Sequence, residues 1–352
     1  MSSRVKLLQS KISKHHSIMV VDYAKLHENP DGPGDHRPTA LKIVELEGVN
    51  DAWKGRIVVI TGCSSGIGIE TARALAVTGA TVVATARNLT KAREALKAIG
   101  SEGQLKLVEM DNNSLDSVRK ASKEILQIAP KINVLINNAG IMATPYAKTK
   151  DGFESQFGVN HLSHFLLFDL LRSALAAGSK STPEFTSRVV VVASVAHRIA
   201  KPNFDDLNFE KTEYNKWAAY GNSKTANVWF ANQIDRLYGT DSDGAIHAFS
   251  LQPGGIKSGL MQHLSVEEMN MFADDPYLIN VFKTPAQGAA TSTFAAISPA
   301  LEGKGGKYLE DCQIIGPQDT SAGRWGPGYG EWAYSPDDEA RLWKVSQKLI
   351  GL

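Results

Sequence analysis

Little in this sequence of 352 residues points to a secreted, membrane-spanning or nucleic-acid-binding protein. Its only cysteines are Cys63 and Cys312, too few for a disulfide framework, so we expect free thiols and a cytoplasmic protein. Neither sign of charge is in excess, and the net charge of +1 gives no support for binding nucleic acid or an anionic membrane. No apolar run approaches the roughly 20 residues that a membrane-spanning helix requires.

The first twenty residues are poor in acids, and four cations precede the first acidic residue, Asp22. This composition is faintly similar to a mitochondrial transit peptide, but the segment lacks a clear amphipathic stripe, which favours a disordered tail. Residues 1–53 have too few apolar side chains for a core of their own. We interpret them as an N-terminal extension with a short helix at 40–44 that packs on the main domain.

Strand and helix patterns alternate from residue 54 to residue 315. This alternation is typical of a parallel sheet that is covered on both faces and joined by right-handed crossovers. The sequence therefore predicts a single α/β domain, a Rossmann-type doubly wound parallel sheet flanked by helices, followed by a tail at 316–352. The expected strands are 56–61, 81–86, 105–110, 134–137, 188–193 and 245–251, with 307–309 as a candidate edge strand; the expected helices are 66–77, 89–99, 115–128, 152–177, 218–237, 285–297 and 338–349.

The stretch from Val58 to Gly68, VVITGCSSGIG, is a run of β-branched residues that ends in a glycine-rich turn before a helix. At such a turn, backbone N–H groups and the positive end of the helix dipole face one point, which favours phosphate binding. Gly62 permits the tight turn, Gly66 lets the backbone approach a pyrophosphate, and Gly68 allows close helix–strand packing. The turn alone could be an ordinary loop, but strand, turn, helix and second strand in this order predict a dinucleotide site.

The end of the second strand, about 20 residues after the turn, decides between NAD and NADP. The sequence there reads Ala86, Arg87, Asn88, with no acid to bind a free ribose 2′-hydroxyl. An arginine offers a planar, multi-donor cation to a 2′-phosphate, and Ser64 and Ser65 add hydroxyl donors. We therefore expect NADP (NADPH) as the cofactor; the alternative for Arg87 is a solvated surface charge.

Tyr220 and Lys224 lie four residues apart and share one face of the expected helix, about 6 Å apart along its axis. A phenol ordinarily has a pKa of about 10, and a nearby ammonium is expected to lower it, so that the pair can exchange a proton with an alcohol or carbonyl oxygen. Ser194 emerges at the carboxyl edge of the sheet, where its hydroxyl can donate to the substrate oxygen. The alternatives are a chance spacing for the pair and strand capping for the serine.

Five motifs follow the glycine turn in order: NNAG at 137–140, VNH at 159–161, AS at 193–194, YGNSK at 220–224 and PGG at 253–255. Together with the turn they make residues 54–315 similar to the short-chain dehydrogenase/reductase family, and most similar to its retinol-dehydrogenase and WW-domain-oxidoreductase branch. The resemblance implies that Lys224 also binds the nicotinamide ribose. It further implies that Asn160 lies in a kinked helix whose freed carbonyl holds a water linked to Lys224; a solvent-facing asparagine is the alternative.

The resemblance also implies that the chain after the fourth strand passes close to the cofactor, that Asp111 lies near the adenine, and that the turn at 253–254 lies beneath the nicotinamide. Ser258 stands where the family often has a threonine that contacts the carboxamide. The expected catalytic residues are Asn160, Ser194, Tyr220 and Lys224, and the expected cofactor contacts are Gly62, Ser64, Ser65, Gly66, Ile67, Gly68, Arg87, Asp111, Asn138, Ala139, Gly140, Tyr220, Lys224, Pro253, Gly254 and Ser258.

Three histidines within or close to these motifs, His161, His164 and His197, invite a metal or acid–base interpretation. No carboxylate or cysteine completes a ligand set, so we expect packing or capping roles and no metal. Cys63, inside the glycine turn, is expected to be an inert position rather than a nucleophile.

The resemblance implies that the segment 257–284 is the variable substrate loop. Its apolar content suggests a hydrophobic, medium-sized carbonyl or alcohol as substrate rather than a sugar phosphate, although core packing explains many of these residues equally well. The aromatic tail at 325–334 is expected to cover part of the cleft or to form an interface, and a homodimer is an option. The function that we expect is an NADPH-dependent carbonyl reductase, reversible as an alcohol dehydrogenase. The alternatives are a non-catalytic NADP-binding sensor or scaffold and a double-bond reductase of the same fold.

Overall fold

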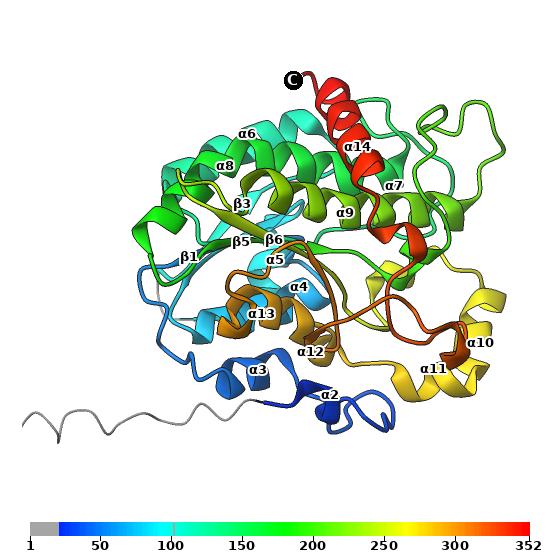
Figure 1. Ribbon diagram of the computed structural model, residues 1–352, viewed down its shortest axis with the longest axis horizontal. Helices are drawn as coiled ribbons and strands as arrows, with labels where there is room; N and C mark the ends of the chain where they lie inside the picture. Colours follow the sequence, from blue (N-terminus) through cyan, green and yellow to red (C-terminus); the bar gives the residue numbers. More distant parts are fainter. Residues whose placement is uncertain (1–20, 101–102) are drawn as a thin grey trace, which may run out of the picture.

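The computed structural model of the protein describes residues 21–100 and 103–352. Its centre is an eight-stranded sheet of order β3-β2-β1-β4-β5-β6-β7-β8, in which β1 to β7 are parallel and β8 runs antiparallel to β7 (Figure 1). The doubly wound parallel sheet is thereby confirmed. The strands are β1 (Ile57–Thr61), β2 (Thr81–Ala86), β3 (Leu105–Glu109), β4 (Val134–Asn137), β5 (Ser187–Val192), β6 (Ile246–Gln252), β7 (Lys307–Glu310) and β8 (Gln313–Ile314).

The strand order reverses between β1 and β4, which pair in register from Val58 opposite Val134. In an open parallel sheet, ligands bind outside the carboxyl ends of the strands at such a reversal. The central strands are buried on both faces, and every residue of β5 and β6 is buried. This explains why their sequences are apolar runs rather than alternating patterns.

Helices cover the sheet in two layers, each with its own apolar cluster (Figure 1). Val58 and Ile60 belong to one cluster and Val59 to the other, because successive side chains of a strand point to opposite faces. The first layer contains α4 (Ile67–Val77), α5 (Leu89–Leu96), α12 (Pro285–Gly288) and α13 (Ala290–Ile297); the second contains α6 (Leu115–Ile128), α8 (Ser163–Ser181), α9 (Lys216–Tyr238) and α14 (Pro336–Leu349).

Three expected elements differ in the structure. The helix expected at 152–177 begins only at Ser155, as α7 (Ser155–Phe157), and passes through a π-helix, η1 (Gly158–Leu162), into α8. The helix expected at 285–297 is divided into α12 and α13 at Ala289. The strand at 307–309 is not an edge strand, because β8 pairs with its outer side.

The segment 257–284 carries two helices that the sequence analysis missed, α10 (Val266–Asp274) and α11 (Pro276–Val281). The signals for both helices are present in the sequence. Ser265 and Glu268 form a capping box at the start of α10, and Asp275 caps α11, whose first residue is Pro276. These helices lie together at one end of the molecule, beyond α12 (Figure 1). We call residues 257–284 the substrate loop.

Both chain extensions pack on the sheet domain. Before β1, α2 (Tyr23–Leu26) is followed by α3 (Ala40–Leu46), which packs on α13 and α4 and buries Ile43 and Val44, as the expected helix at 40–44 should. After β8, α14 packs on α9. The expectations for a tail or transit peptide at 1–20 lie outside the described residues. Within the described part of the chain, no helix is long and apolar enough to cross a membrane.

Candidate active site

The glycine turn joins β1 to α4 at the strand reversal. Gly62 and Gly66 both have positive φ (75° and 64°), a conformation that other residues adopt at a cost. A Cβ on Gly62 would lie 2.8 Å from Cα of Ala139, and a Cβ on Gly68 would lie 2.5 Å from the carbonyl oxygen of Gly62. The turn is therefore closely packed on its inner side.

Thr61 fixes this turn against the loop that follows β4. Its hydroxyl accepts hydrogen bonds from the backbone N–H groups of Asn138 and Ala139, both at 2.9 Å, and the Asn138 side chain donates to the Thr61 carbonyl at 2.8 Å. With both hydroxyl lone pairs in use, Thr61 Oγ1 lies 2.9 Å from His164 Nε2, to which it can donate. Thr61 had no predicted role, although it is the last residue of β1 and directly precedes the first glycine of the turn.

The residues around the turn fit a dinucleotide. Gly66 is the N-cap of α4, no side chain caps that helix, and the nearest atom to a Cβ on Gly66 would be Ser258 Cβ at 3.8 Å. The backbone N–H groups of the first turn of α4 are thus offered to an anion between the glycine turn and Ser258. Ser64 and Ile67 are half-buried, and Ser65 is exposed at the same turn.

The two residues expected at the adenosine end lie at the ends of β2 and β3. Arg87 follows buried Ala86 and is exposed. Asp111 is half-buried; it accepts from Lys150 Nζ at 3.1 Å and from the Asn113 N–H at 3.1 Å. Both residues lie on the same edge of the sheet as the glycine turn, and their contacts with the adenosine stay a prediction.

Ser194, Tyr220 and Lys224 come together at the adjoining carboxyl end of β5. Tyr220 and Lys224 are 3% and 4% exposed, and Lys224 Nζ lies 5.5 Å from the centre of the Tyr220 ring. The Ser194 hydroxyl hydrogen-bonds the phenol. Lys224 Nζ donates to the Val192 carbonyl at 2.9 Å, which fixes the ammonium beneath the ring.

The expected lowering of the phenol pKa by Lys224 is wrong for this structure. Burial raises the pKa of Tyr220 to about 12, and the hydrogen bond from Ser194 opposes this only in part. Burial also lowers the pKa of Lys224 to about 7. Desolvation disfavours the charged form of both groups, so each becomes harder to ionise than in water.

Asn160 lies in the π-helix η1 and is fully buried, so the solvent-facing alternative is wrong. Its side chain accepts from the Ile141 N–H at 2.9 Å and donates to the Ile141 carbonyl at 3.0 Å and to Ser223 Oγ at 2.9 Å. The resemblance implied a carbonyl free to hold a water, but His164 Nδ1 lies 2.9 Å from the Asn160 carbonyl oxygen and donates to it. His164 thereby bridges Asn160 and Thr61.

Loop 138–140 and turn 253–258 complete the site. A Cβ on Gly140 would lie 3.7 Å from Lys224 Nζ, so this loop passes directly over the lysine. Pro253 and Gly254 follow β6 and are half-buried. Ser258 caps a short 3₁₀ helix, η3 (Gly259–Met261), and faces the glycine turn. The structure thus brings the predicted cofactor residues to one edge of the sheet.

The three histidines are buried, and burial lowers the pKa of each: to about 3 for His161 and about 4 for His164 and His197. His161 Nε2 contacts Ser346 Oγ at 2.8 Å, and His197 Nδ1 lies 2.6 Å from the Ser194 carbonyl. Among the described residues, no group of three or more His, Cys, Asp or Glu side chains could hold a metal ion.

Neither described cysteine has the environment of a nucleophile. Cys63 and Cys312 are free and buried, and burial raises the pKa of each thiol to about 12.

Aromatic side chains flank Tyr220 on the side of the substrate loop. The ring of Trp217 meets that of Tyr220 edge-on at 6.4 Å, Phe272 of α10 meets Trp217 at 6.2 Å, and Trp325 of the tail meets Phe272 at 6.5 Å. Trp325 Nε1 also donates to Asp275 Oδ2 at 3.2 Å. The tail therefore contacts the substrate loop, while its role as a cover stays a prediction. Trp217 was missed, although it lies three residues before Tyr220 and so on the same helix face.

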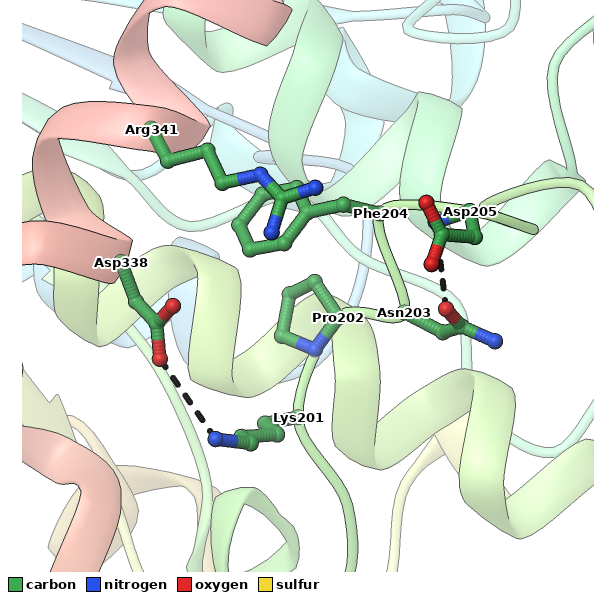
Figure 2. Close-up of a pocket in the computed structure, with 7 residues that line it drawn as sticks. All are labelled: Lys201, Pro202, Asn203, Phe204, Asp205, Asp338 and Arg341. Carbon is green, nitrogen blue, oxygen red and sulfur yellow. Dashed lines mark hydrogen bonds and ion pairs between the residues drawn. The ribbon is translucent and has the colours of Figure 1, made fainter.

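A pocket of about 340 Å³ lies elsewhere, between the loop at 201–205 and α14 (Figure 2). The guanidinium of Arg341 stacks 4.3 Å from the Phe204 ring centre, and Lys201 pairs with Asp338. None of the predicted site residues lines this pocket, and three of its charged side chains, Lys201, Asp338 and Arg341, are already paired or stacked.

The strand reversal, the glycine turn and the adjoining Ser–Tyr–Lys group define a Rossmann-fold oxidoreductase. The sequence matches the family model for short chain dehydrogenases over residues 56–269. The chain therefore belongs to the short-chain dehydrogenase/reductase family.

Relatives extend the similarity beyond that region. The short-chain dehydrogenase/reductase prx1 of Penicillium roqueforti is 44% identical over 346 residues, which cover 98% of each chain. Retinol dehydrogenase 14 of Mus musculus is 37% identical, with 85% of this chain and 86% of that protein covered. A crystal structure of an uncharacterized protein from Mycobacterium paratuberculosis is 34% identical, with a TM-score of 0.62 over 85% of this chain and 94% of the other. The expected retinol-dehydrogenase-like branch is thereby confirmed.

Proposed function

We propose that this protein is an NADPH-dependent oxidoreductase that interconverts a carbonyl and an alcohol on a hydrophobic small molecule. The observation that carries the proposal is the group formed by buried Tyr220 and Lys224 and half-buried Ser194, which lies at the sheet edge beside a helix N-terminus that no side chain caps. A bound nicotinamide supplies or takes up a hydride.

Tyr220 exchanges the proton in this mechanism. In the reducing direction it donates a proton to the carbonyl oxygen as the carbonyl carbon receives hydride; in the oxidising direction its phenolate takes the proton from the alcohol. Ser194 donates to the same oxygen and stabilises its developing charge. Lys224 lies beneath the phenol, where we expect its side-chain nitrogen to bind the ribose hydroxyls, while Asn160 fixes the helix against Ser223.

The raised pKa of Tyr220 predicts a different pH dependence for the two directions of the reaction. With a pKa of about 12, Tyr220 is protonated at neutral pH and is ready to donate. Oxidation requires the phenolate, so its rate is expected to rise with pH through the alkaline range, whereas reduction should not.

Arg87 supports the preference for NADPH. It is exposed at the end of β2 with no acid beside it, so its guanidinium is free to approach a 2′-phosphate. Replacement by aspartate (Arg87→Asp) should raise the Michaelis constant for NADPH by at least about tenfold and leave that for NADH less affected, because a negative charge then faces the phosphate. Equal kinetics of the unmodified protein with NADPH and NADH would contradict the preference.

The apolar and aromatic side chains of the substrate loop support a hydrophobic substrate, and the name of the relative retinol dehydrogenase 14 is consistent with an apolar alcohol. We further propose a cytoplasmic protein, since both described cysteines are free thiols, and a homodimer is an option.

A screen of hydrophobic ketones, aldehydes and alcohols, followed by NADPH absorbance, tests the proposal. Turnover of one class of carbonyl with NADPH is the expected result. Cofactor binding without turnover of any carbonyl would favour an NADP-binding sensor or scaffold, and turnover confined to conjugated double bonds would favour a double-bond reductase.

A further inference from the structure

Arg37 lies in the N-terminal extension, outside the residues that match the family model, and its side chain is only 3% exposed. Its guanidinium contacts the substrate loop where α11 ends. Nη1 donates to the Val281 carbonyl at 2.8 Å, and Nη2 donates to the carbonyls of Asn280 at 3.1 Å and Phe282 at 2.7 Å. The last carbonyls of a helix have no partner within it, so Arg37 caps α11 from a distant part of the chain.

The guanidinium is itself fixed from the other side. Nε donates to both carboxylate oxygens of Asp35, at 2.9 and 2.8 Å, and Nη2 also donates to the Gly32 carbonyl at 3.0 Å. Although burial acts to raise the pKa of Asp35, hydrogen bonds from Arg37 hold it at about 2, so the carboxylate stays charged. Gln287, at the start of α12, donates to Asp35 Oδ1 at 2.9 Å. The N-terminal extension is therefore hydrogen-bonded to the chain on both sides of residue 283, at 280–282 and at Gln287.

Residue 283 contacts the turn at 253–258, which lies on the cofactor side of the site. The Lys283 N–H donates to the Gly255 carbonyl at 2.8 Å, and Lys283 pairs with Ile256 as a parallel bridge. Gly254 packs against the Lys283 side chain, where an added Cβ would lie 2.9 Å from Cδ. Two residues beyond this bridge, Ser258 faces the glycine turn.

We propose that Arg37 is a positioning residue that sets the distance between turn 253–258 and the glycine turn, and with it cofactor affinity and the seating of the substrate loop. This inference rests on the proposed function for the identity of the ligand. Arginine is required because a lysine has three donors on a single nitrogen, whereas the guanidinium serves four carbonyls and a carboxylate in different directions.

Arg188 provides a matched control. Its side chain is 0% exposed; it donates to the Ala295 carbonyl at 3.1 Å and pairs with Glu302 at 3.1 Å, but it lies near the amino end of β5, at the opposite edge of the sheet. If buried arginines in this protein matter only for stability, replacement of Arg37 and of Arg188 should have the same effects on melting temperature and on NADPH affinity.

The test compares Arg37→Lys with Arg188→Lys in the full-length protein. NADPH affinity is measured by titration, exchange of backbone amides by mass spectrometry, and stability by thermal melting. The lysine variant keeps a charge near Asp35 and therefore favours a folded protein; Arg37→Gln is the second, stronger variant.

We expect Arg37→Lys to weaken NADPH binding about tenfold and to accelerate exchange in peptides that span 253–258 and 280–287. Arg188→Lys should lower the melting temperature with affinity unchanged. An unchanged affinity in folded Arg37→Lys, or an equal loss of affinity in Arg188→Lys, would overturn the inference. If the unmodified protein binds neither NADPH nor NADH, the proposed function fails. Amide exchange then tests the positioning role by itself: unchanged protection of residues 280–287 in Arg37→Lys would overturn that role as well.

Discussion

Burial dominates the chemistry of Tyr220 and Lys224. The sequence placed the two side chains on one helix face, and from that spacing alone an ammonium should acidify a phenol. In the folded protein both are almost fully buried, and desolvation acts against either charge. A lysine whose pKa is about 7 is a weaker electrostatic partner than one that is charged throughout the physiological range. The acid–base behaviour of the pair was therefore not predictable from spacing, because it depends on the depth of the site.

Replacement of Lys224 by methionine tests whether burial lowers the pKa of this lysine. Since the pKa of Lys224 is lowered to about 7 in the folded state from its ordinary value of about 10.4, the unfolded chain binds more protons at this side chain between those values. The stability of the unmodified protein relative to Lys224→Met should therefore rise by up to about 1.4 kcal/mol per pH unit above pH 7.

Urea unfolding of both proteins at several pH values between about 6 and 10 measures the difference, which should be flat below the folded-state pKa. A difference that does not vary with pH would mean that the buried lysine keeps its ordinary pKa.

Other residues of the site show what a motif omits. Thr61 stands inside the glycine-turn stretch and His164 three residues after the VNH motif. Their roles appear only when β1, the loop after β4 and the π-helix are in place, because each residue connects two of these. Trp217 could have been noticed from its spacing to Tyr220. Arg37 had no such signal, since the substrate-loop carbonyls that it contacts lie more than 240 residues away in the sequence.

At the scale of elements, the π-helix η1 is the feature that periodicity could not predict. Its residues are apolar enough for an ordinary helix, and an α-helix through 152–177 was expected. The wider turn places Asn160 so that its side chain reaches both Ile141 and Ser223. A local change of helix type at a functional site is a known use of π-helices. Regular elements were predicted well where a cap or a glycine marks the boundary, as for the helix at Leu115–Ile128.

The substrate loop is held on α9 by a single carboxylate. Glu268 Oε2 accepts from Lys216 Nζ at 2.7 Å and from the Ser265 N–H at 2.8 Å, while Oε1 accepts from Trp217 Nε1 at 2.9 Å. One side chain thus links the start of α10 to the helix turn that precedes Tyr220. We expect this contact to keep α10 and Phe272 against the aromatic flank of the site.

Replacement of Glu268 by glutamine should raise the Michaelis constant for the substrate about threefold to tenfold with a smaller change in kcat, because an amide NH₂ cannot accept from Lys216 and the loop opens more easily. Steady-state kinetics with the substrate from the screen measures this. Glu210→Gln is the control, since Glu210 pairs with Lys148 at an exposed surface. Equal effects of both substitutions, or none at Glu268, would show that the contact does not hold the loop.

At the scale of the whole molecule, the alternation of strands and helices was sufficient to predict the sheet and its two layers of helices. This alternation could not predict which parts of the domain the two chain extensions contact. In the N-terminal extension, α3 packs on α13 and Arg37 hydrogen-bonds the substrate loop. The C-terminal tail contacts the same loop through Trp325. Both contacts join segments far apart in sequence, and no local pattern records them. The substrate loop is therefore held from three directions: by the extension, by α9 and by the tail.

The central claim is that Tyr220 transfers the proton while hydride moves to or from the neighbouring carbon. The most direct measurement is the single-turnover rate of NADPH oxidation in Tyr220→Phe, together with the affinity of that variant for NADPH. The account predicts a rate that is lower by about 10²- to 10⁴-fold with affinity within about twofold of the unmodified protein, since phenylalanine keeps the ring and removes only the hydroxyl. A variant that turns over within about tenfold of the unmodified protein would contradict it.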